Sequence, residues 1–568
     1  MMFKVKMLAV ALLLSSLFAL NVYAETTEPA LKKAPLNPAF TEYVKKIKTG
    51  KAQSITKDWY TLGKIPNPIN RSYLKNRAVA PDKDSEATAL FPSSYDLRTT
   101  ARLTAVRNQG DCGSCWTFGT LASLESGLLP GETWNFSENN MKNTHGFLWT
   151  PCDGGNDTMA AAYLLRWSGP VLETADPYSI VDYNNSPSNL TVVKHTQNVH
   201  WLFSSNELKK SIMNHGAVAV SMYWEDTCYN STNKAYYCND STQYTNHEVS
   251  VVGWDDSFSS TKFAQTPPGN GAWIIRNSWG SSWGQNGYFY LSYYDQTGPS
   301  EATLYLPPQS TTVFNHIYQY DPMGNTNDLG YSRATAWGAN VFTAQSNDTI
   351  MAVGTYFLVP NASYELYIYK NVSSSGPRTG TLVYQSTGSV ATSGFSTITL
   401  SSTVFVPASQ KFSVVFRYMT PGYKYPIPVE YPVTESNSGV DFCTTASNAG
   451  ESWMSSAGSS WTDLKNSSDS DIAISNVCIK AYAVTSTASA ATITPPSFSF
   501  LPDIKMFKSA SLASNLFALA DYNLGEPATS YNISTNFLGN TSLSGSTVSQ
   551  AGYSTPTSGR TYFTMTNG

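Results

Sequence analysis

The sequence is poor in charged residues. Only 13% of its 568 residues are Asp, Glu, Lys or Arg, against about 25% in a typical soluble protein. The net charge of −4 offers no basic footprint for nucleic acid, so no nucleic-acid partner is expected. Aromatic residues, Ser, Thr and Asn are abundant instead, a composition that suits an extracellular protein rich in β-structure.

Long apolar runs are also scarce. The clearest, residues 7–20, follows Lys4 and Lys6 and precedes the small-residue site at Ala24. Its roughly fourteen apolar residues are fewer than the roughly twenty that cross a bilayer. Residues 1–24 are therefore predicted to be a cleavable signal peptide rather than a membrane anchor. The mature chain is expected to be secreted, extracellular or at the cell surface, with no transmembrane segment.

Cysteines are few and odd in number. An odd count in an exported protein implies a free thiol or an intermolecular bridge. Three pairs and one nucleophile would account for the seven, and Cys115, six residues after the amide of Gln109, is the candidate for the free thiol. The cysteines are at positions 112, 115, 152, 228, 238, 443 and 478.

Charge divides the chain near residue 90. Residues 25–90 carry twelve basic and seven acidic residues, whereas residues 91–568 carry 22 and 33. The basic stretch is interpreted either as an inhibitory prosegment held by opposite charge or as a solvated spacer. Four of its aromatic residues are candidates for the inhibitory contacts, namely Phe40, Tyr43, Trp59 and Tyr60.

The remaining sequence predicts an α+β domain followed by an all-β sandwich. In residues 91–300, apolar periodicity predicts helices at 113–129, 159–167 and 207–214 and strands at 249–254, 272–276 and 287–294. Residues 301–483 contain short alternating runs separated by turns, which is typical of a sandwich. Residues 484–500 have a linker composition, and residues 501–568 form a partial β-rich segment.

Cys115 is placed to be a nucleophile. A thiol at its reference pKa of about 8.5 is only slightly ionised at pH 7, and the thiolate is the reactive form. A position in the first turn of the predicted helix 113–129 and a neighbouring imidazolium would both lower that pKa. The sequence therefore predicts an ionised sulfur beside a protonated histidine. The histidines available are at positions 145, 195, 200, 215, 247 and 316.

His247 differs from the other five because it opens an apolar strand. Asn277 follows it thirty residues later, near the end of another predicted strand. An asparagine there would orient the imidazole, as the third member of a catalytic triad does.

The segments around these residues resemble the papain-like cysteine peptidases, in the order that family shows. They are Gln109-Gly-Asp-Cys112-Gly-Ser-Cys115-Trp116, Asn246-His247 and Asn277-Ser-Trp279-Gly-Ser-Ser-Trp-Gly-Gln-Asn-Gly-Tyr288. The resemblance implies an α+β two-lobed domain and hydrolysis of peptide bonds in protein or peptide substrates. It also implies a covalent thioester intermediate.

The resemblance also assigns roles residue by residue. Cys115 would be the nucleophile, His247 the base and acid, Asn277 the orienting residue, and Gln109 the side-chain donor of the oxyanion hole. Substrate contacts are expected from Gly154, Gly155, Glu248 and Trp279, with Glu248 favouring a basic substrate side chain. A bridge between Cys112 and Cys152 is implied, and Cys228 with Cys238 and Cys443 with Cys478 would complete the pairs. No metal or other cofactor is expected.

Residues 301–483 resemble the lectin-like domain that follows papain-like domains in some secreted prokaryotic peptidases. This resemblance implies either binding of cell-surface carbohydrate or an inert spacer. Trp453 and Trp461 would then stack on sugar rings or pack in the core.

Two other functions remain open on the sequence alone. One is an extracellular binding or adhesion protein whose peptidase fold is vestigial. The other is a thiol-disulfide oxidoreductase that uses Cys112 and Cys115 as a redox couple.

Overall fold

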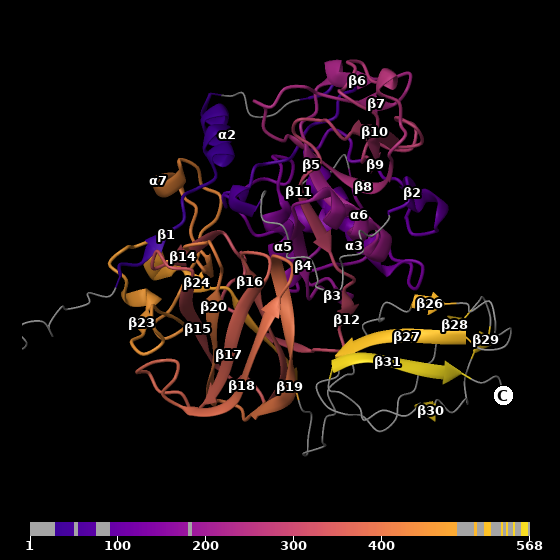
Figure 1. Cartoon of the computed structure of the whole chain (residues 1–568). Coiled ribbons are helices and arrows are strands. Elements are labelled where there is room, and N and C mark those ends of the chain that lie inside the picture. The colour runs from indigo at the N-terminus through magenta and orange to yellow at the C-terminus, as the bar shows by residue number, and fades with distance from the viewer. Residues whose placement is uncertain are drawn as a thin grey trace, which may run out of the picture. The chain divides into compact units, whose positions relative to one another are not determined.

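The computed structural model describes residues 29–49, 55–74, 91–179 and 185–485, together with short strands between residues 505 and 565. The predicted signal peptide, and the predicted linker beyond residue 485, lie outside the described residues. The chain divides into two units, residues 1–490 and 491–568. Figure 1 shows the course of the chain.

A central helix, α3 (Cys115–Leu128), organises the first part of the larger unit. It begins at Cys115, so the prediction that this residue lies in the first turn is confirmed. The sequence predicted one apolar face, but residues 115–126 are all buried. Helices and strands enclose α3 on every side, and polar side chains such as Thr117 and Glu125 are therefore buried with it. The other helices here are α4 (Glu138–Thr144), α5 (Asp157–Leu165) and α6 (Ser205–His215).

An antiparallel sheet packs against α3. Its strands are β4 (Val199–Leu202), β11 (Ser300–Tyr305), β5 (Val218–Met222), β8 (His247–Asp255), β9 (Ala272–Arg276) and β10 (Tyr288–Ser292), in that spatial order. The helices and strands predicted in residues 91–300 all exist, with ends shifted by up to two residues. The sequence missed α4. It also placed β11 at a domain boundary, although β11 lies inside this sheet between β4 and β5.

Residues beyond β11 form a β-sandwich. One layer has the order β18 (Thr381–Val390), β17 (Ala362–Lys370), β20 (Lys411–Met419), β15 (Thr335–Thr343), β22 (Ser452–Ser455) and β23 (Thr462–Asp463). The other contains β13 (His316–Tyr318), β25 (Ile479–Thr485), β16 (Asp348–Phe357) and β19 (Gly394–Val406). Strand β19 also pairs with β4, through Gly394 with His200 and Phe395 with Val199. The sheet that packs against α3 and this layer of the sandwich are thus continuous.

The first part of the N-terminal segment packs on the β-sandwich. Strand β1 (Lys32–Lys33) pairs with β14 (Asn327–Gly330), which pairs in turn with β21 (Ile427–Glu430). Helix α2 (Pro38–Lys48) begins after Asn37, whose side chain accepts from the backbone N–H of Ala39. Phe40 on α2 is fully buried against Phe442, with ring centroids 5.7 Å apart. The first half of the segment is therefore anchored on the sandwich.

The cysteine pairing is only partly as predicted. Cys112 and Cys152 form a disulfide, which confirms that pair. Cys228 and Cys238 are buried free thiols that lie close enough to hydrogen-bond across the hairpin of β6 (Tyr229–Asn230) and β7 (Ala235–Tyr236). Their predicted disulfide is not formed.

The predicted Cys443–Cys478 bridge is wrong, and both thiols are buried and free. Cys443 hydrogen-bonds to the backbone of Val433 and Cys478 to that of Pro428. The sulfur of Cys443 donates to the backbone oxygen of Tyr431 at 3.5 Å. The two cysteines are thus held by different residues of β21 and of the chain that follows it.

The smaller unit contains an antiparallel sheet in the order β26 (Lys505–Phe507), β27 (Leu516–Asn523), β31 (Ser558–Met565) and β30 (Ser549–Gln550). Strands β28 (Asn536–Phe537) and β29 (Thr541–Ser542) form a separate pair. Across the described residues, no helix combines the length and apolar character that a membrane span requires.

Candidate active site

His247 and Asn277 are in direct contact. His247 opens β8 and Asn277 follows β9, its neighbour in the sheet. Nε2 of His247 lies 2.8 Å from Oδ1 of Asn277, and this carbonyl oxygen also accepts the backbone N–H of Ser278. Nδ1 of His247 is buried and has no hydrogen-bond partner. Asn277 thus fixes the ring through one nitrogen and leaves the other available for chemistry.

Trp279 covers this pair. Its indole stacks on the imidazole of His247, with centroids 4.8 Å apart, and is only 1% exposed. The indole thus keeps water from the hydrogen bond to Asn277, and in a low-dielectric surrounding such a bond is stronger.

The amide of Gln109 is oriented by a contact that the sequence analysis missed. Oε1 of Gln109 accepts from the hydroxyl of Ser278 at 2.6 Å, which turns Nε2 toward the backbone oxygens of Cys112 and Thr61. Ser278 lies inside the quoted Asn277-Ser-Trp-Gly motif, so the motif contained the signal. The amide donor at Gln109 is thereby held in one orientation.

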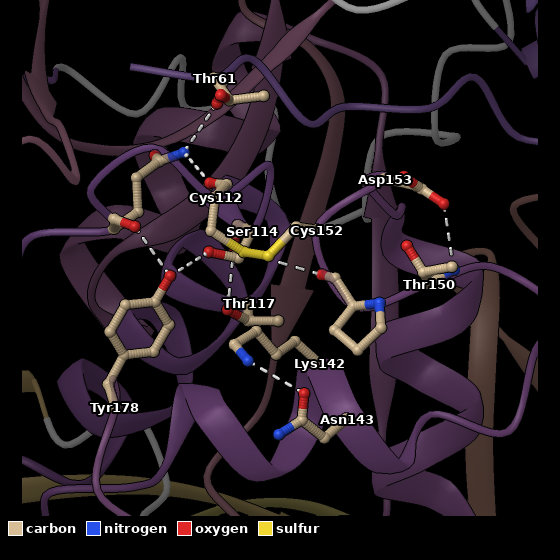
Figure 2. Close-up of a disulfide and its surroundings, with 12 residues drawn as sticks. Thr61, Cys112, Ser114, Thr117, Lys142, Asn143, Thr150, Cys152, Asp153 and Tyr178 are labelled. Atoms are coloured by element: carbon tan, nitrogen blue, oxygen red, sulfur yellow. Dashed lines mark hydrogen bonds between the residues drawn. A yellow bond between two sulfur atoms is a disulfide. The ribbon is translucent and has the colours of Figure 1, made fainter. Parts of the chain in front are cut away.

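The Cys112–Cys152 disulfide fastens the loop that precedes α3. Figure 2 shows this bridge with Ser114 and Tyr178 beside it. The hydroxyl of Tyr178 donates to the backbone oxygen of Gln109 at 2.8 Å and lies 2.7 Å from Oγ of Ser114. A cross-link and two hydrogen bonds thus hold the turn from which Cys115 projects.

Part of the N-terminal segment, residues 55–74, lies against the residues around Cys115. The backbone N–H of Gly155 donates to the oxygen of Gly63 at 2.8 Å, and Ile65 donates to the oxygen of Gly155 at 2.9 Å. A Cβ on Gly63 would lie 1.8 Å from the backbone oxygen of Gly113, so only glycine fits there. Gly155 therefore pairs with a peptide backbone that belongs to the chain itself.

The aromatic candidates of this segment have different positions. Tyr60 stacks on Trp279, Phe40 packs on Phe442, and Tyr43 lies near Trp149. Trp59 is 77% exposed. Only Tyr60 among the four contacts a predicted site residue.

Covering the site changes its electrostatics. Burial raises the pKa of the Cys115 thiol to about 12, with the Glu248 carboxylate adding to the rise. Burial also lowers the pKa of His247 to about 4, against the hydrogen bond to Asn277. The predicted thiolate and imidazolium are therefore absent from this covered state. Burial disfavours both charged forms. The sequence predicted a possible inhibitory segment, but not that it would bury these two groups.

Glu248 lies beside His247 on β8 and is buried. Its carboxylate, with those of Asp157 and Glu301, surrounds Nζ of Lys64 at 3.2 to 3.4 Å. The sequence analysis singled out Glu248 alone. Asp157 follows the glycines at 154 and 155 closely, but nothing in the sequence indicated that Glu301 would join it.

Four of the five other histidines have structural surroundings, and the fifth, His215, is the last residue of α6. His145 accepts from the backbone N–H of Phe147, His195 stacks on Trp167, and His316 pairs with Asp348 at 2.7 Å. His200 is a strand residue of β4. Among the described residues, none of these four hydrogen-bonds to Asn277 or Gln109.

The indoles of the sandwich are packed rather than free. Trp453 is 7% exposed and donates to the backbone oxygen of Gly450. Trp461 is half-buried against the apolar cluster that contains Trp337 and Trp453, and it donates to the backbone oxygen of Gly458. For Trp453, packing in the core is the correct alternative.

Comparisons with known proteins identify the families that the two regions resemble. Residues 91–305 match the model of the papain family cysteine proteases, and residues 317–483 match that of the lectin like domain. A probable cysteine protease of Arabidopsis thaliana, RD19B, is 30% identical over 227 residues, which are 36% of this chain and 59% of that protein. Mouse pro-cathepsin H is 29% identical over 225 residues, which are 36% of this chain and 61% of that protein. The chain thus spans about three fifths of these relatives.

A solved structure shares both regions. It contains the cysteine protease and lectin-like domains of Cwp84, a surface layer associated protein of Clostridium difficile. It is 22% identical, has a TM-score of 0.68 and covers 81% of this chain and all of that one. The shared fold extends through both regions. Residues 91–305 of this chain are thus a papain-family cysteine protease domain, and residues 317–483 are a lectin-like domain.

Proposed function

We propose that this chain is the latent precursor of a secreted cysteine endopeptidase with a Cys115, His247 and Asn277 triad. The observation that carries the proposal is the His247–Asn277 contact beneath Trp279, with one imidazole nitrogen left unpaired. Cys115 at the start of α3 and the fixed amide of Gln109 supply the other two parts that acyl transfer needs.

The mechanism begins when residues 55–74 leave the cleft. The Cys115 thiol transfers its proton to Nδ1 of His247, and the sulfur attacks the substrate carbonyl carbon. Negative charge on the carbonyl oxygen is stabilised by Nε2 of Gln109 and the backbone N–H of Cys115. His247 then gives its proton to the departing amine as the C–N bond breaks, which leaves a thioester on Cys115. Water, deprotonated by His247, hydrolyses the thioester and restores the thiol.

The covered state supports the latency part of the proposal. Nε2 of Gln109 already donates to Thr61, and the backbone N–H of Gly63 hydrogen-bonds to the sulfur of Cys115. A substrate carbonyl therefore has no access to the donor or to the nucleophile. The segment from 55 to 74 is proposed to be inhibitory, with residues 25–90 as the prosegment.

The lectin-like domain is proposed to place the enzyme near carbohydrate at a cell surface. The family match supports this role. Trp453 is packed in the core, so it is not proposed to stack on a sugar ring.

The Cys112–Cys152 bridge argues against the oxidoreductase alternative. A redox couple needs Cys112 and Cys115 to bond to each other, but Cys112 is bound to Cys152. A vestigial peptidase fold is opposed by the presence of all four catalytic groups.

Active-site labelling tests the proposal. The secreted protein is treated with an epoxide thiol trap before and after removal of the N-terminal segment and is mapped by mass spectrometry, with a dipeptidyl amide assay alongside. We expect labelling at Cys115 and hydrolysis only after removal, and neither in Cys115→Ala. A processed protein with an unlabelled Cys115 and no hydrolysis would support the adhesion alternative instead.

A further inference from the structure

The pocket next to Cys115 is already occupied by a lysine. Lys64 is fully buried, and its Nζ lies 3.4 Å from Asp157, 3.2 Å from Glu248 and 3.2 Å from Glu301. Its backbone N–H donates to the oxygen of Asn246, the residue before the proposed base. The side chain thus extends from a backbone held in the substrate cleft into a pocket with three carboxylates.

The three carboxylates come from separate parts of the domain. Asp157 begins α5, Glu248 lies on β8, and Glu301 lies on β11. The fold brings the three carboxylates together around Nζ of Lys64. In the part of the chain that the structure describes, their ion pairs are with Lys64 and, for Asp157, also with Arg71. Both cations belong to the N-terminal segment.

Removing the segment would leave the pocket acidic and unpaired. The side chains of Asp157 and Glu248 are 3% and 2% exposed, and a buried carboxylate without a partner is costly. Oε1 of Glu248 has no hydrogen-bond partner even when Lys64 fills the pocket. A substrate that brings a cation would recover the lost interactions, whereas an aliphatic side chain would leave them unmade.

We propose that Asp157, Glu248 and Glu301 form a specificity pocket for lysine, and that Lys64 is the substrate mimic that fills it in the precursor. The proposal rests on the peptidase activity proposed above and names its substrate class. Gly63 lies at the Cys115 sulfur, and Lys64 pairs with Gly155 through a parallel bridge. A substrate that pairs with Gly155 in the opposite, antiparallel direction places in this pocket the residue on the amino side of the scissile one.

The geometry favours lysine over arginine. An ammonium group has three donors on one nitrogen, and three carboxylate oxygens surround that nitrogen here at nearly equal distances. A planar guanidinium presents its donors in a flat fork, which suits one carboxylate approached from the side.

Substrate profiling tests the proposal in the full chain, with a site-specific protease sequence placed between residues 75 and 90 so that every variant is processed identically. Dipeptidyl fluorogenic amides differing only at the penultimate residue are compared, with active enzyme counted by the epoxide trap. We expect kcat/KM for lysine to exceed that for leucine at least about 100-fold and that for arginine about tenfold. Equal or better hydrolysis of the leucine substrate would overturn the pocket while leaving the peptidase proposal intact.

Amide variants identify the residues. Glu248→Gln and Glu301→Gln should each lower kcat/KM for the lysine substrate at least about tenfold and change that for leucine little. Glu132→Gln removes a half-exposed carboxylate that pairs with Lys194 and is the matched control. An unchanged ratio of lysine to leucine in both pocket variants would contradict the assignment.

A binding measurement decides the matter without catalysis. Processed Cys115→Ala protein is titrated with a synthetic peptide of residues 55–74 and with its Lys64→Met and Lys57→Met forms. We expect the Lys64→Met peptide to bind at least about 30-fold more weakly, and the Lys57→Met peptide to bind like the parent because Lys57 is exposed. Equal affinity of all three peptides would overturn the pocket, even if no substrate were hydrolysed.

Discussion

The ring of Tyr60 lies flat on the indole of Trp279, with centroids 4.9 Å and planes 8° apart. Its hydroxyl also donates to the backbone oxygen of Trp279 at 3.0 Å. The residue that shields the His247–Asn277 bond is therefore itself the docking surface for the N-terminal segment. Release of the segment and exposure of the site are one event in this arrangement.

Tyr60→Ala should loosen the precursor. Stacked aromatic pairs contribute about 0.5 to 1.5 kcal/mol beyond burial of area, so the covered state should open roughly tenfold more often. The measurement is the rate at which Cys115 of the unprocessed chain reacts with iodoacetamide. Trp59→Ala is the control, because the neighbouring Trp59 is exposed. Equal rates in the two variants would show that the stack does not hold the segment.

Gln109→Ala in the processed enzyme should lower kcat about 100 to 1,000-fold, because one donor to the developing oxyanion is lost. Ser278→Ala should have a smaller effect, since it removes only the hydroxyl that orients the amide. Both are measured by steady-state hydrolysis of one dipeptidyl amide, with active sites counted by the epoxide trap. A greater loss in Ser278→Ala than in Gln109→Ala would be inconsistent with these roles.

Thiol reactivity should depend on pH differently before and after processing. In the precursor, burial raises the pKa of Cys115 to about 12 and lowers that of His247 to about 4. Between these values the thiol and the imidazole are both neutral, so alkylation should stay slow at pH 5 to 9 and rise only in strong alkali. Removing the segment reverses the desolvation, which lowers the thiol pKa and raises the imidazole pKa.

The measurement is the rate of iodoacetamide alkylation across pH 4 to 10, with reacted cysteines mapped by mass spectrometry. Processed enzyme should be alkylated at Cys115 well below pH 8. His247→Ala in processed enzyme is the control and should lose that low-pH reactivity. Superimposable profiles for precursor and processed enzyme would contradict the account of latency.

Mapping the disulfides under non-reducing conditions should find Cys112 joined to Cys152, and Cys443 and Cys478 unlinked. The last two should react with an alkylating reagent only after denaturation, because both are buried. A linked Cys443–Cys478 peptide would show that the register of the sandwich is different.

The Cys112–Cys152 bridge closes a loop with a sequence separation of 40 residues. Replacing both cysteines by alanine should therefore lower the free energy of unfolding by about 4 kcal/mol on loop entropy. Urea unfolding followed by fluorescence measures the change. Replacing Cys443 by alanine is the comparison, since its cost comes from packing alone, and the same loss in reducing and oxidising buffer is expected for it.

The local elements of the site were predictable from the sequence. Cys115 starts a helix and His247 starts a strand because capping, periodicity and apolar alternation act over a few neighbouring residues. Ser278 was missed inside a recognised motif, since its hydroxyl has a function only when Gln109 lies opposite. The free state of Cys443 was also missed, because counting cysteines does not reveal sheet register.

The sequence by itself thus determined the helix and strand that carry Cys115 and His247, and its resemblance to known families indicated the two domain types and the bridge at Cys112. Tertiary structure alone decided that Lys64 would lie among Asp157, Glu248 and Glu301. These contacts join residues separated by up to 237 positions, and such proximity depends on strand order and register, which local patterns do not encode. Whether the thiol of Cys115 is charged or neutral was likewise decided by what covers it, since burial sets the cost of ionisation.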